Sequence, residues 1–243
     1  VYCRAGLPKK RHFMLRLVWI SLFILCSNWA ISASIDPATL LAGVKKKYDL
    51  VNNYSAVAQL KTNVLFIKAP ISLVTIYYRK PDQLKIKNQK GISFVPKGTI
   101  NINLNNVLGL QNFEAIDAGT TSIDGINCQI VKVFPINDAE EITRATLYID
   151  PARLVVLRSL ISTRENGTYE IQMGYGAYTN WGLPDKVIVE FNTRDFKLPK
   201  GTTLDYDNGS TKNNNPKGPQ KGKVEILYKS YLINKGVTDA QLQ

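Results

Sequence analysis

Histidine is almost absent from this sequence. The 243 residues contain one, His12, which lies within the first 33 residues. The rest of the chain therefore lacks the imidazole that serine triads, histidine-ligated zinc and imidazole acid–base chemistry require. The carboxylates do not replace it, since the stretch Asp205–Gly209 lacks the sixth-position glycine and twelfth-position glutamate of a calcium loop. These absences predict a protein that is not an enzyme and that has no metal site and no cofactor.

Cysteine is also scarce, with Cys3, Cys26 and Cys128 as its three occurrences. Only Cys128 follows residue 33, so the chain from residue 34 onward has no internal disulfide and its core must stabilise the fold alone. Cys128 belongs to the alternating stretch INCQIVKV and is predicted to point into the core as a small hydrophobe. Cys26 could mark a lipoprotein, but Leu25 precedes it where a small residue is expected.

The apolar run from Leu17 to Leu25 is too short to span about 30 Å of hydrocarbon. The cations Lys9, Lys10, Arg11 and Arg16 precede it, and small residues ending at Ala33 follow it, an order typical of a secretory signal peptide. We expect residues 1–33 to be a leader cleaved near Ala33 and residues 34–243 to form a single domain. Residues 1–13 precede Met14, and the sequence leaves open whether they are native.

Acidic residues are outnumbered, with 19 Asp and Glu against 31 Lys and Arg. Five of the cations lie in the leader, so the net charge of +12 falls to +7 for the rest of the chain. The lysines are scattered, without an aromatic stacking platform or a nucleic-acid motif. We interpret them mainly as a solvated face, with attraction to anionic lipid or an acidic partner as the second interpretation, and predict no nucleic-acid partner.

The strongest positive signal is an alternation of apolar and polar residues from Tyr54 to Phe66, which is typical of a half-buried strand. The pattern resumes over Ile71–Tyr78 and recurs along the chain, with hairpin signals at Asp124-Gly125 and Asn166-Gly167. It predicts a mainly β protein of roughly eleven strands, nearly all joined by hairpins. We expect residues 201–223, which are rich in Asn, Gly and Lys, to form a mobile loop.

One convincing helix precedes these strands. Asp36 can cap it, Pro37 suits its first position, and apolar residues recur at helical spacing from Leu40 to Val51. A short second helix is expected within residues 105–113. A sheet of about eleven strands curls into an open or closed barrel with an apolar interior. Side chains fill such an interior, or it keeps a cavity for an apolar ligand, and composition alone does not decide between the two.

Short motifs add a family resemblance that covers most of residues 36–232. The leader is followed by the helix and the stretch NNYSA, then by a strand ending in YYRKPDQL, and later by LYIDP, YGAY and LPDKV. This arrangement resembles the periplasmic outer-membrane lipoprotein carrier family, LolA and its lipoprotein-sorting relatives. Residues 201–223 have no counterpart in that pattern.

The resemblance implies an unclosed antiparallel β-barrel with a helical lid over an apolar cavity that receives acyl chains. It also implies a carrier in the periplasm of a double-membraned bacterium, which moves lipoproteins or other lipids towards the outer membrane and meets partner proteins at the inner and outer membranes. The alternative is an envelope sensor that uses the same half-barrel to bind lipid or a protein partner. Nothing in the sequence separates the two functions or fixes the lipid and the oligomeric state.

The alternation predicts an inward-facing set of residues that lines one apolar cavity, and a filled barrel core is the alternative. The set comprises Leu60, Val64, Leu73, Ile86, Phe94, Ile102 and Val189, with Leu41 and Val44 from the lid helix.

A lid latch is the last expectation. Lipoprotein carriers often place an arginine before the proline of this turn, from where it can hydrogen-bond carbonyls of the lid. Here Lys80 occupies that position and Arg79 precedes it. Lysine lacks the planar donor fork of arginine, so a latch built on it should be weaker. The resemblance implies that Arg79 or Lys80 holds the lid, and the alternative is two solvated charges beside a turn.

Overall fold

The computed structural model describes residues 35–64, 67–68, 71–90, 104–110, 112–165, 167–192 and 221–243. Residues 34–243 form one compact unit, distinct from residues 1–33. The expected leader and most of the expected loop at 201–223 lie outside the described residues. No helix of the described ranges is long and apolar enough to cross a membrane.

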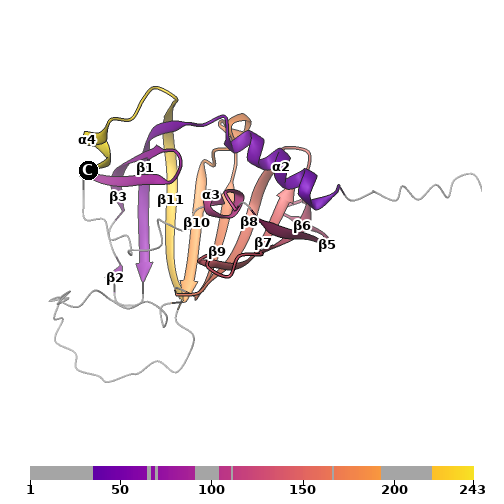
Figure 1. Cartoon of the computed structure of the whole chain (residues 1–243). Helices are drawn as coiled ribbons and strands as arrows, with labels where there is room; N and C mark the ends of the chain where they lie inside the picture. The colour runs from indigo at the N-terminus through magenta and orange to yellow at the C-terminus, as the bar shows by residue number, and fades with distance from the viewer. Residues whose placement is uncertain are drawn as a thin grey trace, which may run out of the picture. The chain divides into compact units, whose positions relative to one another are not determined.

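The described chain is dominated by one antiparallel sheet (Figure 1). Its strands follow the order β4-β3-β1-β11-β10-β9-β8-β7-β6-β5, and β2 pairs with β1 beside this path. No described pairing joins the end strands β4 and β5, so the barrel is unclosed, which confirms the predicted fold class and strand number. The bounds are β1 Asn53–Val64, β2 Ile67–Lys68, β3 Ser72–Arg79, β4 Gln83–Lys90, β5 Phe113–Ile123, β6 Ile126–Pro135, β7 Ile142–Asp150, β8 Val155–Thr163, β9 Gly167–Gly174, β10 Lys186–Asn192 and β11 Lys221–Ile233.

Local turn chemistry explains two of the hairpin connections. Asp124 and Gly125 have φ of 49° and 78° and join β5 to β6, and Gly167 has φ of 75° at the start of β9. Residues with positive φ match the twist of a tight hairpin, which is why these dipeptides were informative. β11 begins at Lys221, so residues 221–223 are strand and do not belong to the expected loop.

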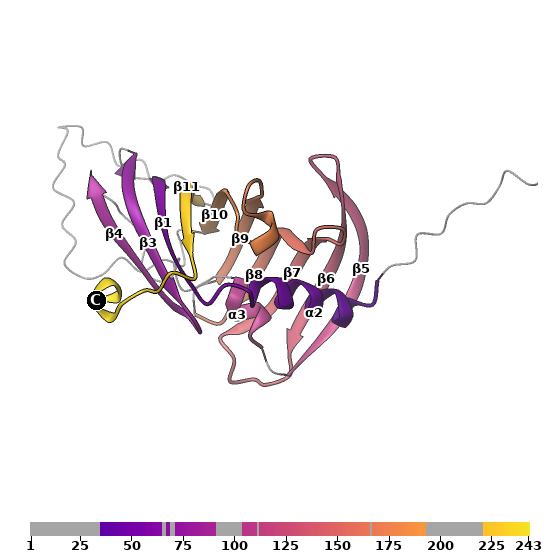
Figure 2. The same cartoon turned by 90° about the horizontal axis from the view of Figure 1, so that it is seen from above.

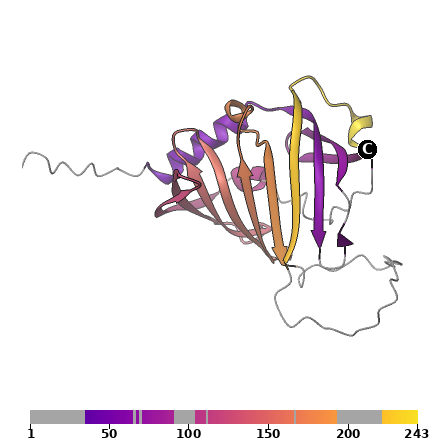
Figure 3. The ribbon, with the colours of Figure 1, turned by 180° about the vertical axis from the view of Figure 1, so that it is seen from behind.

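Helix α2, Pro37–Tyr48, begins as predicted, because the side chain of Asp36 accepts a hydrogen bond of 2.9 Å from Thr39 N. The other helices are short: α3 Leu104–Leu108, the 3-10 helix η1 Thr179–Trp181, and α4 Asp239–Leu242. Seen from above, α2 and α3 lie on the concave side of the curved sheet (Figure 2). Seen from behind, β9, β10 and β11 face the viewer and α2 lies beyond the sheet (Figure 3).

The concave face of the sheet carries the main apolar core. Leu40, Leu41 and Val44 of α2 are buried in the same cluster as inward residues of the strands, among them Ala56 of β1 and Leu147 of β7. Cys128 is buried as predicted, but it belongs to a smaller cluster with Val155 and Leu157. Burial raises the pKa of the Cys128 thiol above its ordinary value.

Candidate functional site

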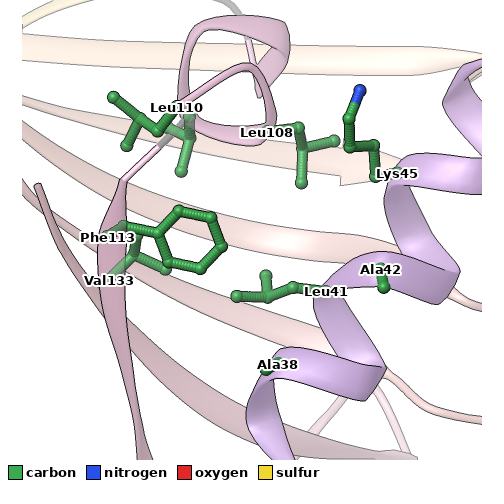
Figure 4. A pocket seen from close by; sticks show the side chains of 9 residues that line it. Ala38, Leu41, Ala42, Lys45, Leu108, Leu110, Phe113 and Val133 are labelled. Atoms are coloured by element: carbon green, nitrogen blue, oxygen red, sulfur yellow. The ribbon is translucent and has the colours of Figure 1, made fainter.

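An apolar pocket lies between α2, α3 and the neighbouring strands β5 and β6 (Figure 4). Its volume is about 150 Å³. Lys45 is the one charged residue in its lining, and its Nζ forms an ion pair of 3.1 Å with Oδ2 of Asp49. The lining consists of Ala38, Leu41, Ala42, Lys45, Val107, Leu108, Leu110, Phe113 and Val133.

The pocket is small for a lipid. Sites for small molecules usually measure about 300–1,000 Å³, and an apolar cavity of about 150 Å³ holds a molecule the size of benzene. Side chains of the core occupy much of the remaining interior, where Leu60, Val74 and Ile76 are 0–1 % exposed. A long acyl chain therefore needs more room than this pocket offers.

Five residues of the predicted inward set belong to one apolar cluster: Leu41, Val44, Leu60 and Val189 are buried in it, and Ile86 packs against it. Of these five, only Leu41 lines the pocket. The side chain of Val64 and the whole of Phe94 and Ile102 lie outside the described residues, so their part in a cavity stays a prediction.

Leu73 requires a correction. It pairs with Gln59, whereas Leu60 pairs with Ser72, so Leu73 lies on the outer face of the sheet. The inward residues of β3 are Ser72, Val74, Ile76 and Tyr78, all buried. Apolar residues occur on both faces of this strand, so its composition did not reveal which face is inside.

The sequence interpretation did not assign α3 to the site. The expected short helix near residue 105 is present, but three of the residues that follow its start, Val107, Leu108 and Leu110, line the pocket opposite α2. The first of them, Val107, lies 59 positions after Tyr48, the last residue of α2, and no local pattern indicates that contact.

The C-terminal end of α2 is attached to the sheet through Lys80. Its Nζ donates to the Asp49 carbonyl at 2.9 Å and lies 3.1 Å from Asp49 Oδ1. Asp49 is the residue that caps α2, so the lysine binds a carbonyl that no further helical turn satisfies. Burial raises the pKa of Asp49, but hydrogen bonds from Lys45 and Lys80 outweigh burial, and the pKa lies below its ordinary value.

The N-terminal end of α2 is attached through Gln129, a buried residue of β6. Gln129 Nε2 donates to the Ile35 carbonyl at 2.6 Å, and Gln129 Oε1 accepts from Ile35 N at 3.2 Å. This pair of bonds fixes the backbone one residue before the helix cap.

Two contacts hold the last turn of α2 on its other flank. Lys47 Nζ donates to the carbonyl of Arg153 in the turn between β7 and β8. The Tyr48 hydroxyl lies 3.1 Å from the Tyr175 hydroxyl, which in turn donates to the Val156 carbonyl at 3.0 Å. Burial raises the pKa of Tyr48 to about 12, so both phenols are neutral near pH 7.

Arg79 does not contact α2 in the described contacts. Its guanidinium donates to Gln83 Oε1 at 2.7 Å, to Asp239 Oδ1 at 2.6 Å and to the Val237 carbonyl at 3.3 Å. It therefore ties the C-terminal segment to β3, and only Lys80 of the predicted pair reaches the lid helix.

No cluster of metal-ligating side chains is found among the described residues. The site offers an apolar lining, a cover and polar attachments at the two ends of that cover. Such an arrangement can shield an apolar ligand from water.

The comparisons with known proteins give a consistent result for the fold. Neither a family model nor a curated protein matches the sequence. A LolA-superfamily protein from Nitrosomonas europaea superposes with a TM-score of 0.53, at 8% identity, over 86% of this chain and 98% of its own. A putative outer membrane lipoprotein-sorting protein domain from Vibrio parahaemolyticus gives 0.52, at 7% identity, over 85% and 97%. A DUF1329 family protein from Desulfovibrio piger also gives 0.52, at 14% identity, over 86% and 98%.

An open antiparallel sheet whose concave face is covered by an N-terminal helix defines a class of half-barrel proteins. Within that class, the chain has the LolA-like fold that the sequence motifs predicted.

Proposed function

We propose that this protein binds acyl chains of lipoproteins or other lipids in the apolar interior beneath α2 and carries them through the periplasm towards the outer membrane. The observation that carries the proposal is the way α2 is held. The buried side chains of α2 cover the apolar concave face of the sheet. The described polar contacts that attach α2 to the sheet lie at its two ends, just before its first residue and at its last turn.

The free energies of the exchange are of the same order. Removing α2 exposes Leu40, Leu41 and Val44, at about 1.5–3 kcal/mol each, or about 5–9 kcal/mol in all. An acyl chain with about 15 methylenes gains about 12 kcal/mol when it leaves water. One entering chain can therefore offset the displacement of the helix, and the helix can return when the chain leaves.

The comparisons support the proposal through the descriptions of the similar structures. Two of the similar structures are described as a lipoprotein-sorting domain and a LolA-superfamily protein. The expected leader supports a periplasmic location, and hand-over between membranes would require partners at the inner and outer membranes.

A reversible disulfide between α2 and the sheet tests the proposal. A Cβ added at Gly43 of α2 would lie 3.8 Å from Cγ of Leu154, in the turn before β8, so the two side-chain positions are in direct contact and were chosen for a pair of cysteines. We expect the oxidised Gly43→Cys/Leu154→Cys variant of residues 34–243 to lose uptake of a fluorescent fatty acid, and a reductant to restore it.

The Gly43→Cys single variant is the control, because it carries the same helix substitution without the cross-link. The native Cys128 is 1 % exposed and should not interfere. Uptake that is equal in the oxidised and reduced double variant would refute the role of α2 as a removable cover. A second experiment separates a carrier from a sensor. Transfer of a lipoprotein between two vesicle populations would identify a carrier, whereas a stable complex with an inner-membrane regulator and no transfer would identify a sensor.

A further inference from the structure

Two large apolar side chains are exposed beside the C-terminal end of α2. Leu50 is 49 % exposed and Trp181 of η1 is 39 % exposed. Leu50 N donates to the Lys47 carbonyl at 3.2 Å, and a Cβ built on Gly182, next to Trp181, would lie 3.5 Å from Lys47 Cγ. Both residues therefore flank the last turn of the lid helix.

Five cations lie at or near the same end of α2. Lys45, Lys46 and Lys47 form the last turn of α2, Lys80 reaches the same turn, and Arg153 lies against Lys47. Two carboxylates accompany the five cations: Asp49 pairs with Lys45 and Lys80, and Asp150 pairs with Arg153. Among these seven residues the positive charges exceed the negative ones by three, and the group together with Leu50 and Trp181 is hereafter called the cationic rim.

Lys46 is the most outward of these cations. It is exposed, and it lies on the side of α2 opposite the buried Leu40, Leu41 and Val44. Its ammonium group has no hydrogen bond or ion pair with another described residue, so it is available to an anion from solution.

We propose that the cationic rim docks on the surface of an anionic lipid bilayer. Tryptophan prefers the level of the headgroups, a neighbouring leucine can enter the acyl boundary, and lysines near the surface are attracted to lipid phosphates. An acidic protein would satisfy the cations, but it would need matching pockets for two separate protruding apolar groups. A lipid surface accepts both without preformed pockets, so the lipid is the better match.

The proposal goes beyond acyl-chain binding and does not depend on it. Docking through the cationic rim places the C-terminal end of α2, together with its contact to Lys80, at the surface of the membrane. A protein whose interior binds no lipid could still dock in this way, and the experiment measures docking without uptake.

Trp181 is the only tryptophan after residue 33, since Trp19 and Trp29 precede it. The test therefore uses residues 34–243, which form one compact unit, after circular dichroism has confirmed a β-rich fold. We expect vesicles of phosphatidylcholine with a quarter of phosphatidylglycerol to shift Trp181 emission to the blue and to sediment the protein. Pure phosphatidylcholine should do neither, and salt at about 1 M should weaken the effect.

Matched variants assign the docking to the cationic rim. Lys46→Gln should weaken partitioning about fivefold, the usual effect of one lysine near an anionic surface, and Leu50→Ser should also weaken it. Lys132→Gln and Leu232→Ser change exposed residues on the outer face of the sheet and should have no effect.

Three results would overturn the proposal. The first is the absence of sedimentation with anionic vesicles. The second is sedimentation without a blue shift, which would assign binding to another face. The third is binding of a soluble acidic polypeptide that Lys46→Gln weakens, with no binding to vesicles, which would assign the cationic rim to an acidic protein.

Discussion

Replacing Lys80 by methionine tests the attachment of the lid at a single point. The change keeps the length of the side chain and removes the two contacts of Nζ with Asp49, at 2.9 Å to the carbonyl and 3.1 Å to Oδ1. The backbone hydrogen bond from Lys80 N to the Asn52 carbonyl does not involve the side chain and remains.

The expected loss follows from the exposure of the pair. The side chains of Lys80 and Asp49 are 32% and 48% exposed, so their ion pair counts as a surface pair of about 0.2–1 kcal/mol. The bond to the helix-terminal carbonyl adds to this, and Lys45 continues to hold Asp49. We expect a total of about 1 kcal/mol, which corresponds to about fivefold more frequent opening of α2 and to a change of at most about 4 °C in Tm.

Amide hydrogen exchange measures this opening residue by residue. In Lys80→Met, amides in the last turn of α2 should exchange about fivefold faster, while amides in the buried strands β7 and β8 keep their rates. Arg79→Met is the matched control, because the described partners of Arg79 lie in β4 and the C-terminal segment and none in α2. Unchanged exchange in α2 of Lys80→Met, or an equal increase in Arg79→Met, would refute the latch.

Three further predictions concern the cover and the core. Gln129→Met removes two partly buried hydrogen bonds and should lower the free energy of opening in the first turn of α2 by about 1–2 kcal/mol, so that its amides exchange faster. An equal increase of exchange in the last turn would contradict this. The lowered pKa of Asp49 means that its contact with Lys80 stabilises α2 above about pH 4 and is lost as the pH falls through that pKa; exchange of α2 followed against pH checks this, and a loss near pH 6 would count against it. Leu147→Ala, at a position 0 % exposed, should lower the free energy of unfolding in urea by about 2–5 kcal/mol, whereas Leu232→Ala, at 62 % exposed, should change it by less than about 0.5 kcal/mol.

Local features of the sequence predicted much of the fold. Asp36 and Pro37 fix the start of α2, because capping involves residues within one helical turn. The Asp124-Gly125 turn fixes the β5–β6 hairpin, because positive φ at both residues is a property of the dipeptide itself. The alternation in β1 predicted its buried face correctly, as Ala56, Ala58 and Leu60 show.

Where the chain is apolar on both faces, the sequence did not determine the arrangement. β3 carries Leu73 and Tyr77 on one face and Val74, Ile76 and Tyr78 on the other. Pairing with β1 decides which face lies inside, and it buries Ser72 while it leaves Leu73 partly exposed on the outer face. A shift of one residue would reverse the faces, so the register matters more than the hydrophobicity of any single residue.

The site depends on contacts that only the tertiary structure provides. The sequence predicted an amphipathic helix before the sheet, and the family motif pointed to Lys80, but the partner of Lys80 is a carbonyl 31 positions away. The pocket joins α2 to Val107 and Phe113, and the cationic rim joins it to Trp181. Short-range patterns determine which segments are helix or strand and where they turn, because those preferences arise within a few residues. Which side chains meet across the concave face is decided by the order and register of the strands, because each such contact depends on the placement of the whole sheet.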